Sequence, residues 1–125
     1  MSFHEFTIHV RTSTKIFSGT DDDVFIDIIG ESAQTGWTKL DNPYKNDFER
    51  GNTDKFKLYF TDLGTINAVR LKKNGRDDWR VHSVQIDTTG GGKMRKYLFK
   101  PRVKKIKKKI KLPKAFSTPE ISSMM

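Results

Sequence analysis

Short segments in which apolar and polar residues alternate run through the first 100 residues of the chain. In residues 5–12 the apolar positions are Phe6, Ile8 and Val10, which is the period of a strand with one buried face. Residues 24–30 are more continuously apolar, which is typical of a central strand. The same criteria predict further strands at residues 55–60, 66–71, 78–86 and 94–99.

The alternation changes phase once, within residues 78–86. Val81 and Val84 fall on opposite phases of the alternation, so the pattern predicts a β-bulge near His82 and Ser83. The two tryptophans, Trp37 and Trp79, are assigned to the core, because large aromatic side chains in β proteins usually pack there.

The spacing of these segments indicates the fold class. No window of about 11 residues in this region keeps the apolar period of a helix. Short strands separated by Gly, Asn and Asp at intervals of roughly 8–12 residues favour an all-β, antiparallel sandwich or barrel. We expect a two-sheet β-sandwich of about seven or eight strands. Residues 41–54 form the long irregular connection, and such loops on a rigid β scaffold often carry sites.

The charge divides the chain into two parts. Residues 1–99 hold 15 Lys/Arg and 14 Asp/Glu, whereas residues 100–125 hold nine Lys/Arg and one Glu. The sequence therefore predicts a domain over residues 1–100 and a polybasic, flexible C-terminal tail over residues 101–125. Within the tail, Val103, Ile106 and Ile110 would share one side if an anionic partner induced a helix.

Several functional classes are excluded or disfavoured by composition and motifs. The chain has no Cys, so it has neither disulfides nor a thiolate metal site or nucleophile. It also has no apolar run near the ~20 residues of a membrane span, no signal peptide pattern and no Gly-x-Ser-x-Gly or His-Glu-x-x-His motif. We expect a protein that is not an enzyme and that is cytoplasmic or peripherally bound to a membrane. A secreted protein also fits these observations.

Four segments, in this order, carry a resemblance to a known family. They are Gly19-Thr20-Asp21 before Val24-Phe25-Ile26; Leu40-Asp41-Asn42-Pro43 with Asn46-Asp47-Phe48-x-x-Gly51-x-x-Asp54-x-Phe56; Leu63-Gly64-x-Ile66-x-x-Val69-Arg70-Leu71; and Trp79-x-Val81-x-x-Val84-x-Ile86. Residues 3–100 thereby resemble a PLAT (lipoxygenase homology) domain, with loops most similar to the C-terminal module of clostridial phospholipase C toxins.

The resemblance implies a sandwich of two four-stranded sheets that contacts lipids, membranes or a protein partner. It further implies calcium binding at the loops of one end, with candidate ligands Gly19 (carbonyl), Thr20, Asp21, Asp41, Asn42, Asn46 and Asp47. Such a mixture of carboxylate, amide and carbonyl oxygens is what calcium prefers. Where family members often place an acid two residues before the glycine, this chain has Phe17, so one family site is expected to be missing or incomplete.

The residues leave alternative interpretations open. The acids at 21–23 and 41 could form solvated turns without any ion, and Phe17 and Tyr44 could either insert at a lipid interface or cover the sandwich end. The basic tail could bind an anionic membrane, bind nucleic acid or direct nuclear import, or maintain solubility. Its candidate membrane-contact residues are Lys104, Lys105, Lys107, Lys108, Lys109 and Lys111.

Two functions follow from these features. The first is a non-catalytic lipid- or membrane-docking module that calcium assists and that uses the polybasic tail as a second anchor. The alternative is a protein-interaction adaptor whose basic tail serves targeting or nucleic-acid binding.

Overall fold

A computed structural model describes residues 4–15, 18–20, 22–42, 47–75, 78–90, 93–101, 109–113 and 121–123. These residues form strands and loops, with no helix among them. The strands are β1 (His4–Thr12), β2 (Val24–Gly30), β3 (Thr38–Leu40), β4 (Thr53–Phe60), β5 (Ile66–Lys73), β6 (Val81–Gly90), β7 (Lys93–Phe99), β8 (Lys109–Pro113) and β9 (Ile121–Ser123).

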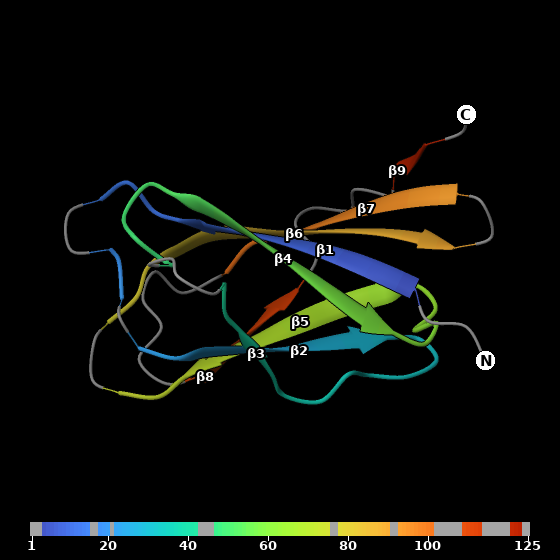
Figure 1. Ribbon diagram of the computed structural model, residues 1–125, viewed down its shortest axis with the longest axis horizontal. Helices are drawn as coiled ribbons and strands as arrows, with labels where there is room; N and C mark the ends of the chain where they lie inside the picture. Colours follow the sequence, from blue (N-terminus) through green and yellow to red (C-terminus); the bar gives the residue numbers. More distant parts are fainter. Residues whose placement is uncertain are drawn as a thin grey trace.

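The strands form two antiparallel sheets that pack as a sandwich (Figure 1). Sheet A has the order β4-β1-β6-β7-β9, and sheet B has the order β3-β2-β5-β8. The predicted all-β sandwich is therefore confirmed. Sheet A has one strand more than the four expected, because the three-residue β9 pairs with the edge of β7. A strand of that length is too short for an alternation to reveal it.

Strand β8 lies in the basic segment that the sequence assigned to the tail. It pairs with β5, so that Ile110 lies opposite Leu71 and Leu112 opposite Val69. The sequence of β8, "KIKLP", alternates apolar and basic residues, and this two-residue period fits an edge strand of sheet B. The helical interpretation grouped Ile110 with Val103 and Ile106, both of which lie outside the described residues.

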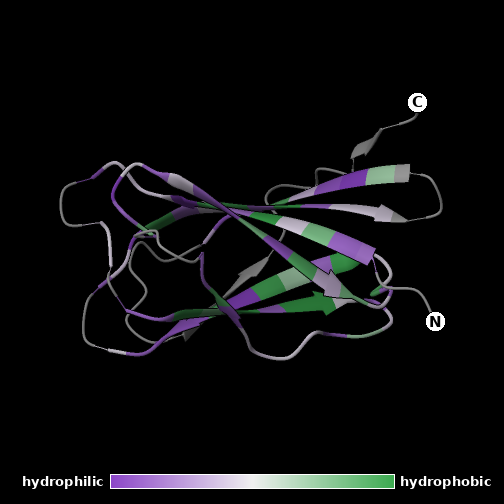
Figure 2. Cartoon of the chain, in the orientation of Figure 1, coloured by the Kyte–Doolittle hydropathy of each residue, from purple (hydrophilic) through white to green (hydrophobic). Residues whose placement is uncertain are grey.

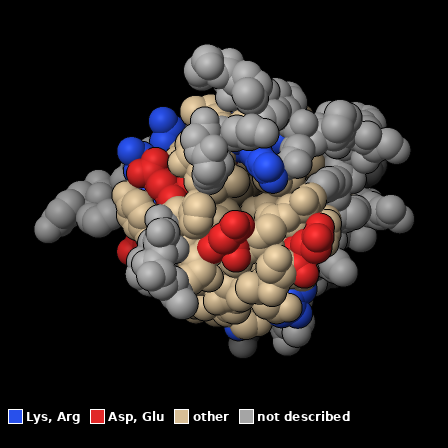
Figure 3. Space-filling view, turned by 90° about the vertical axis from the view of Figure 1, so that its right-hand side faces the viewer, with Lys and Arg blue, Asp and Glu red and all other residues tan. Residues whose placement is uncertain are grey.

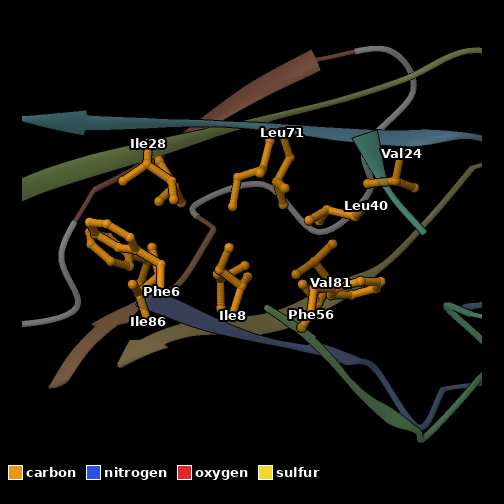
Figure 4. Close-up of a cluster of buried hydrophobic side chains, with 14 of the residues drawn as sticks. Phe6, Ile8, Val24, Ile28, Leu40, Phe56, Leu71, Val81 and Ile86 are labelled. Carbon is orange, nitrogen blue, oxygen red and sulfur yellow. The ribbon is translucent and has the colours of Figure 1, made fainter. Parts of the chain in front are cut away.

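The core fills the space between the two sheets (Figure 4). Alternate residues of each strand point inward, and the alternation of hydrophobic and hydrophilic colours along the strands is visible in Figure 2. Ile8, Val10, Ile26 and Ile86 are completely buried. Burial of this apolar surface is the main force that holds the sheets together.

The predicted bulge is present between β1 and β6. Arg11 lies opposite Ser83 but Thr12 lies opposite Val81, so His82 has no partner in the register. Both Val81 and Val84 can consequently face the core, although they are an odd number of residues apart.

The two tryptophans have different environments. Trp79 is fully buried, packs edge-to-face on Phe48 at a centroid distance of 5.1 Å, and donates a hydrogen bond to Thr12 Oγ1. Trp37 is only half-buried, and cations of β5 lie over its ring. The assignment of Trp37 to the core is therefore wrong, because Trp37 lies in the loop before β3 and covers the outer side of sheet B.

Asp27 holds that loop on sheet B. Its carboxylate is completely buried although Asp27 belongs to the outward phase of β2. It accepts hydrogen bonds from the Gly36 backbone N–H (2.9 Å), from Gln34 Nε2 (3.0 Å), and from Arg70 Nε and Nη2 (2.9 and 2.7 Å). A buried carboxylate needs such donors, since it has lost its hydration.

Candidate functional site

Three loops meet at the end of the sandwich where β1 ends and β2 begins, on the left in Figure 1. We call this end the loop end; its loops span residues 13–23, 41–52 and 74–80. Backbone hydrogen bonds connect the loops, from Thr20 N–H to Phe48 O (3.1 Å) and from Arg80 N–H to Ser18 O (3.0 Å). The structure thus brings together the two acidic loops that the sequence singled out.

The contact between the two acidic loops depends on Gly19. A Cβ atom at this position would lie 3.0 Å from Phe48 O and 3.1 Å from Arg50 N, closer than ordinary van der Waals contact. Phe48 itself is held in a left-handed conformation, with a φ of 65°, while its N–H donates to Asp54 Oδ2 at 2.7 Å. Its ring packs between Phe56 and Trp79. The second acidic loop is therefore anchored directly on the core.

The second loop contains three predicted ligands that the structure describes. Asn42 donates its backbone N–H to Asp47 Oδ2 (2.9 Å) and its Nδ2 to Asp47 Oδ1 (3.0 Å). This pair closes the loop and positions the Asp47 carboxylate, which keeps lone pairs for other donors or an ion. Asp41 is exposed to solvent.

The first loop contributes Gly19 and Thr20. Thr20 is buried, and its Oγ1 accepts a hydrogen bond from the Asp22 N–H (3.1 Å), so this hydroxyl has a structural role. The hydroxyl of Ser18 is completely buried and has no hydrogen-bond partner in the part of the chain that the structure describes. The predicted ligands Asp21 and Asn46, and the aromatics Phe17 and Tyr44, lie outside the described residues.

The two acids that follow Asp21 are bound by residues that the sequence analysis missed. Asp22 Oδ2 lies 2.8 Å from the ammonium of Lys73, whose side chain is completely buried. Asp23 pairs with Lys39 at 3.4 Å, where both side chains are about half exposed. Alternation in β5 places Lys73 on the same inward face as Leu71. From this position the sequence could have predicted a buried lysine, and a buried lysine needs an acidic partner.

The pKa of His82, in the bulge at the same end, is lowered. Partial desolvation of the imidazole is the larger cause, and the positive charges of Arg11 and Lys100 lower it further. These cations also mean that the loop end is not uniformly acidic.

The donors at the loop end fit a hard cation in chemical type. Asp41, Asp47, the Asn42 amide and the Gly19 carbonyl offer only oxygen, which suits calcium rather than zinc or copper. Among the described residues, no three His, Cys, Asp or Glu side chains are grouped so that they could hold a metal ion. A complete coordination shell therefore requires oxygens beyond these acids.

The opposite end of the sandwich faces the viewer in Figure 3, where small acidic and basic groups are separated by other residues. It contains a pocket of about 240 Å³ that the sequence did not predict, lined by residues that include His4, Asp62, Thr88 and Arg95. Asp62 accepts a hydrogen bond from the Gly64 N–H, as expected for a turn.

The fold and the paired acidic loops define a β-sandwich of the lipoxygenase-homology type. The PLAT/LH2 domain family matches residues 6–109, so the chain belongs to this family. The mouse (Mus musculus) lipoxygenase homology domain-containing protein 1 is 40% identical over 99 residues, which cover 77% of this chain and 5% of that protein. The chain thus corresponds to a small part of this relative.

Solved structures agree with this assignment. The coral 8R-lipoxygenase, described as activated by calcium through a C2-like domain, matches with a TM-score of 0.75 and 27% identity over 88% of this chain and 17% of that chain. The alpha toxin from Clostridium absonum matches with a TM-score of 0.66 and 21% identity over 87% of this chain and 30% of that chain, which shows a shared fold. No helix in the described part of the chain is long and apolar enough to cross a membrane.

The Asp22–Lys73 pair gives a testable role to Gly75. Gly75 has a φ of 79°, and an added Cβ would overlap the Asp22 carboxylate. Gly36 has nearly the same φ, 78°, but nothing lies within 4 Å of its added Cβ. We expect Gly36→Ala to lower the free energy of unfolding by about 1–2 kcal/mol from backbone strain alone. Gly75→Ala should lower it by at least about 1 kcal/mol more, because Asp22 must move away from Lys73. Urea unfolding of both variants checks this; equal losses would contradict it.

Proposed function

We propose that this chain is a non-catalytic module that docks on anionic membranes, assisted by calcium at the loop end and by the basic segment 102–111 as a second anchor. The observation that carries the proposal is the hydrogen-bonded junction of the two acidic loops at one end of the sandwich. The calcium activation described for the coral relative supports it, because that protein is activated through a domain of the same fold.

The proposed calcium ligands are those predicted from the sequence. Asp41, Asp47, Asn42 and the Gly19 carbonyl would hold the ion, together with Thr20, Asp21 and Asn46. Bound calcium would supply positive charge that attracts lipid phosphates and would cross-link the loops. Asp22 is not included, because Lys73 already neutralises it. We expect a weak site, with a Kd of about 10⁻⁴–10⁻³ M without lipid.

The proposed membrane contacts surround this end and the basic segment. Phe17 and Tyr44 interrupt the acidic loops and would insert at the lipid interface, where aromatic side chains are favoured. The lysines at 104, 105, 107, 108, 109 and 111 would contribute about 1 kcal/mol each near an anionic leaflet, before screening. Strand β8 fixes positions 109 and 111 at the edge of sheet B.

A protein-interaction adaptor is the second candidate. Met94 and Leu98 lie on the outward phase of β7, where their side chains are 40% and 38% exposed. A protein partner that covers them would bind whether or not calcium is present. In that case the basic segment would serve targeting or nucleic-acid binding.

Co-sedimentation with vesicles tests the membrane proposal. The full chain is mixed with phosphatidylcholine vesicles, with or without phosphatidylserine, in calcium or in chelator. We expect binding that needs the anionic lipid and is tighter in calcium. Binding that depends neither on lipid charge nor on calcium would contradict the proposal. So would the absence of binding under every condition, and either result would favour the adaptor.

The role of the basic segment is tested by substitution rather than by truncation, because β8 is part of sheet B. Lys104, Lys105 and Lys107 are changed together to Gln and compared with Lys55→Gln, Lys57→Gln and Lys96→Gln, three exposed lysines of sheet A. We expect the first triple to weaken vesicle binding about a hundredfold at low ionic strength and the second to have a much smaller effect. Equal effects would contradict a specific anchor.

A further inference from the structure

The outer side of sheet B carries an aromatic and cationic surface that the loop end does not explain. We call it the sheet B face and define it by Phe25, Trp37, Arg70 and Lys72. The Lys72 ammonium lies 4.6 Å from the centroid of the Trp37 ring and 5.3 Å from that of Phe25. The Arg70 guanidinium lies 4.6 Å from the Trp37 centroid. These distances are within the range of cation–π contacts.

One cation of this face, Lys72, has no acidic partner among the described residues. Arg70 is neutralised by Asp27, and Lys39 of β3 pairs with Asp23. The Lys72 ammonium instead lies against the rings of Trp37 and Phe25. Its positive charge is therefore held in place by aromatic contacts but is not neutralised.

Strand β8, whose sequence is basic, pairs with the part of β5 that carries this face. The register places Lys109 opposite Lys72 and Lys111 opposite Arg70. Directly opposite residues of an antiparallel pair belong to the same face of a sheet. The sheet B face therefore borders a strand whose sequence is basic at these two register positions.

We propose that the sheet B face, centred on Lys72 and Trp37, is a second membrane-contact surface that binds anionic lipid headgroups without calcium. This inference rests on the proposed membrane function and adds to it a named surface. The domain would then lie with the loop end and the sheet B face against one bilayer. These two regions adjoin where β2 begins and β3 ends, at the paired residues Val24 and Leu40.

The chemistry of the face favours a bilayer over nucleic acid. Trp and Lys are the residues that settle at a membrane interface, where the ring and the ammonium both remain near the headgroups. Nucleic-acid binding surfaces offer free aromatic rings for base stacking, whereas the Trp37 ring already carries two cations at 4.6 Å. The one arginine on the face is engaged with Asp27 and is not free to bind a phosphate in a bidentate manner.

The test compares Lys72→Gln with Lys57→Gln in chelator, with phosphatidylserine-containing vesicles. Lys57 is an exposed lysine on the outer side of sheet A, so the charge change is the same. We expect Lys72→Gln to weaken binding about fivefold at low salt and Lys57→Gln to have little effect. Thermal melting of both variants shows whether each remains folded, and Lys72→Arg should restore binding.

Tryptophan fluorescence provides a second readout. Spin-labelled lipids in the vesicles should quench Trp37 on the sheet B face but not the buried Trp79, and the Trp37→Phe variant identifies the Trp37 contribution.

If the full chain binds vesicles but Lys72→Gln binds as tightly as Lys57→Gln and Trp37 is unquenched, the proposal for the sheet B face fails and the membrane function stands. If the full chain binds no vesicle, both fail. Tighter binding to RNA than to vesicles, with loss in Lys72→Gln, would assign the face to nucleic acid instead.

Discussion

Replacing Asp27 with alanine is expected to destabilise the domain by about 3–5 kcal/mol, because it removes a buried carboxylate that accepts four hydrogen bonds and pairs with the one-third-exposed Arg70. Arg70 would lose its counter-charge, while Gln34 and the Gly36 N–H would lose their acceptor. The carboxylate site itself is completely buried, so its loss leaves a space that the loop and β5 no longer bridge by hydrogen bonds. The loop that carries Trp37 would detach from sheet B as a consequence.

Urea unfolding measures this effect, and Asp23→Ala is the matched control. Asp23 is also paired with a lysine, but that pair is about half exposed and should contribute less than about 1 kcal/mol. We also expect Asp27→Ala to shift the emission of Trp37 toward that of a solvent-exposed indole before global unfolding. A loss below 1 kcal/mol for Asp27→Ala would show that the carboxylate does not hold the loop.

Asp41→Asn is expected to weaken calcium binding roughly tenfold or more, because the number of ligand charges strongly sets the affinity of a calcium site. Asp41 suits this test since it is exposed and accepts no hydrogen bond among the described residues. Its removal should therefore leave the melting temperature nearly unchanged. Asp47→Asn would be less clear, because Asp47 also closes its loop through Asn42.

Calorimetric titration of calcium measures this change, with Asp62→Asn as the control. Asp62 is an exposed acid at the opposite end of the sandwich, so the variant loses the same charge without touching the loop end. If both variants lose calcium affinity to the same extent, calcium binds through the overall charge of the domain. Unchanged affinity of Asp41→Asn alone would remove Asp41 from the ligand set.

The fold could be predicted from sequence where burial dictates a two-residue period. The strands that contain Ile8, Ile26 and Ile86 follow this rule, and the bulge at His82 is visible as a break in the period. The rule is less informative for β8, because its short apolar pattern also fits one side of a helix. Only pairing with β5 selects the strand, and that pairing is a long-range contact.

The candidate site could be predicted only in part. The four motifs implied that the acidic loops meet, and the hydrogen bond from Thr20 to Phe48 connects them. The alternation in β5 marks Lys73 as an inward cation, but it does not identify Asp22 as its partner, because the two residues are 51 positions apart. The environment of Trp37 was missed for the same reason, since Asp27 and Arg70 hold its loop from two different strands.

The proposed function depends on calcium binding at the loop end of this PLAT/LH2 domain. A calcium titration followed by NMR tests it most directly, with backbone amide resonances as the readout for each residue. We predict saturable shifts for Gly19, Asp41, Asn42 and Asp47, with a midpoint of about 10⁻⁴–10⁻³ M, and none for Asp62 and Gly64 at the opposite end. Resonances of the loop end that stay unchanged up to about 10 mM calcium, well above the affinity range of weak extracellular sites, would show that the loop end does not bind calcium.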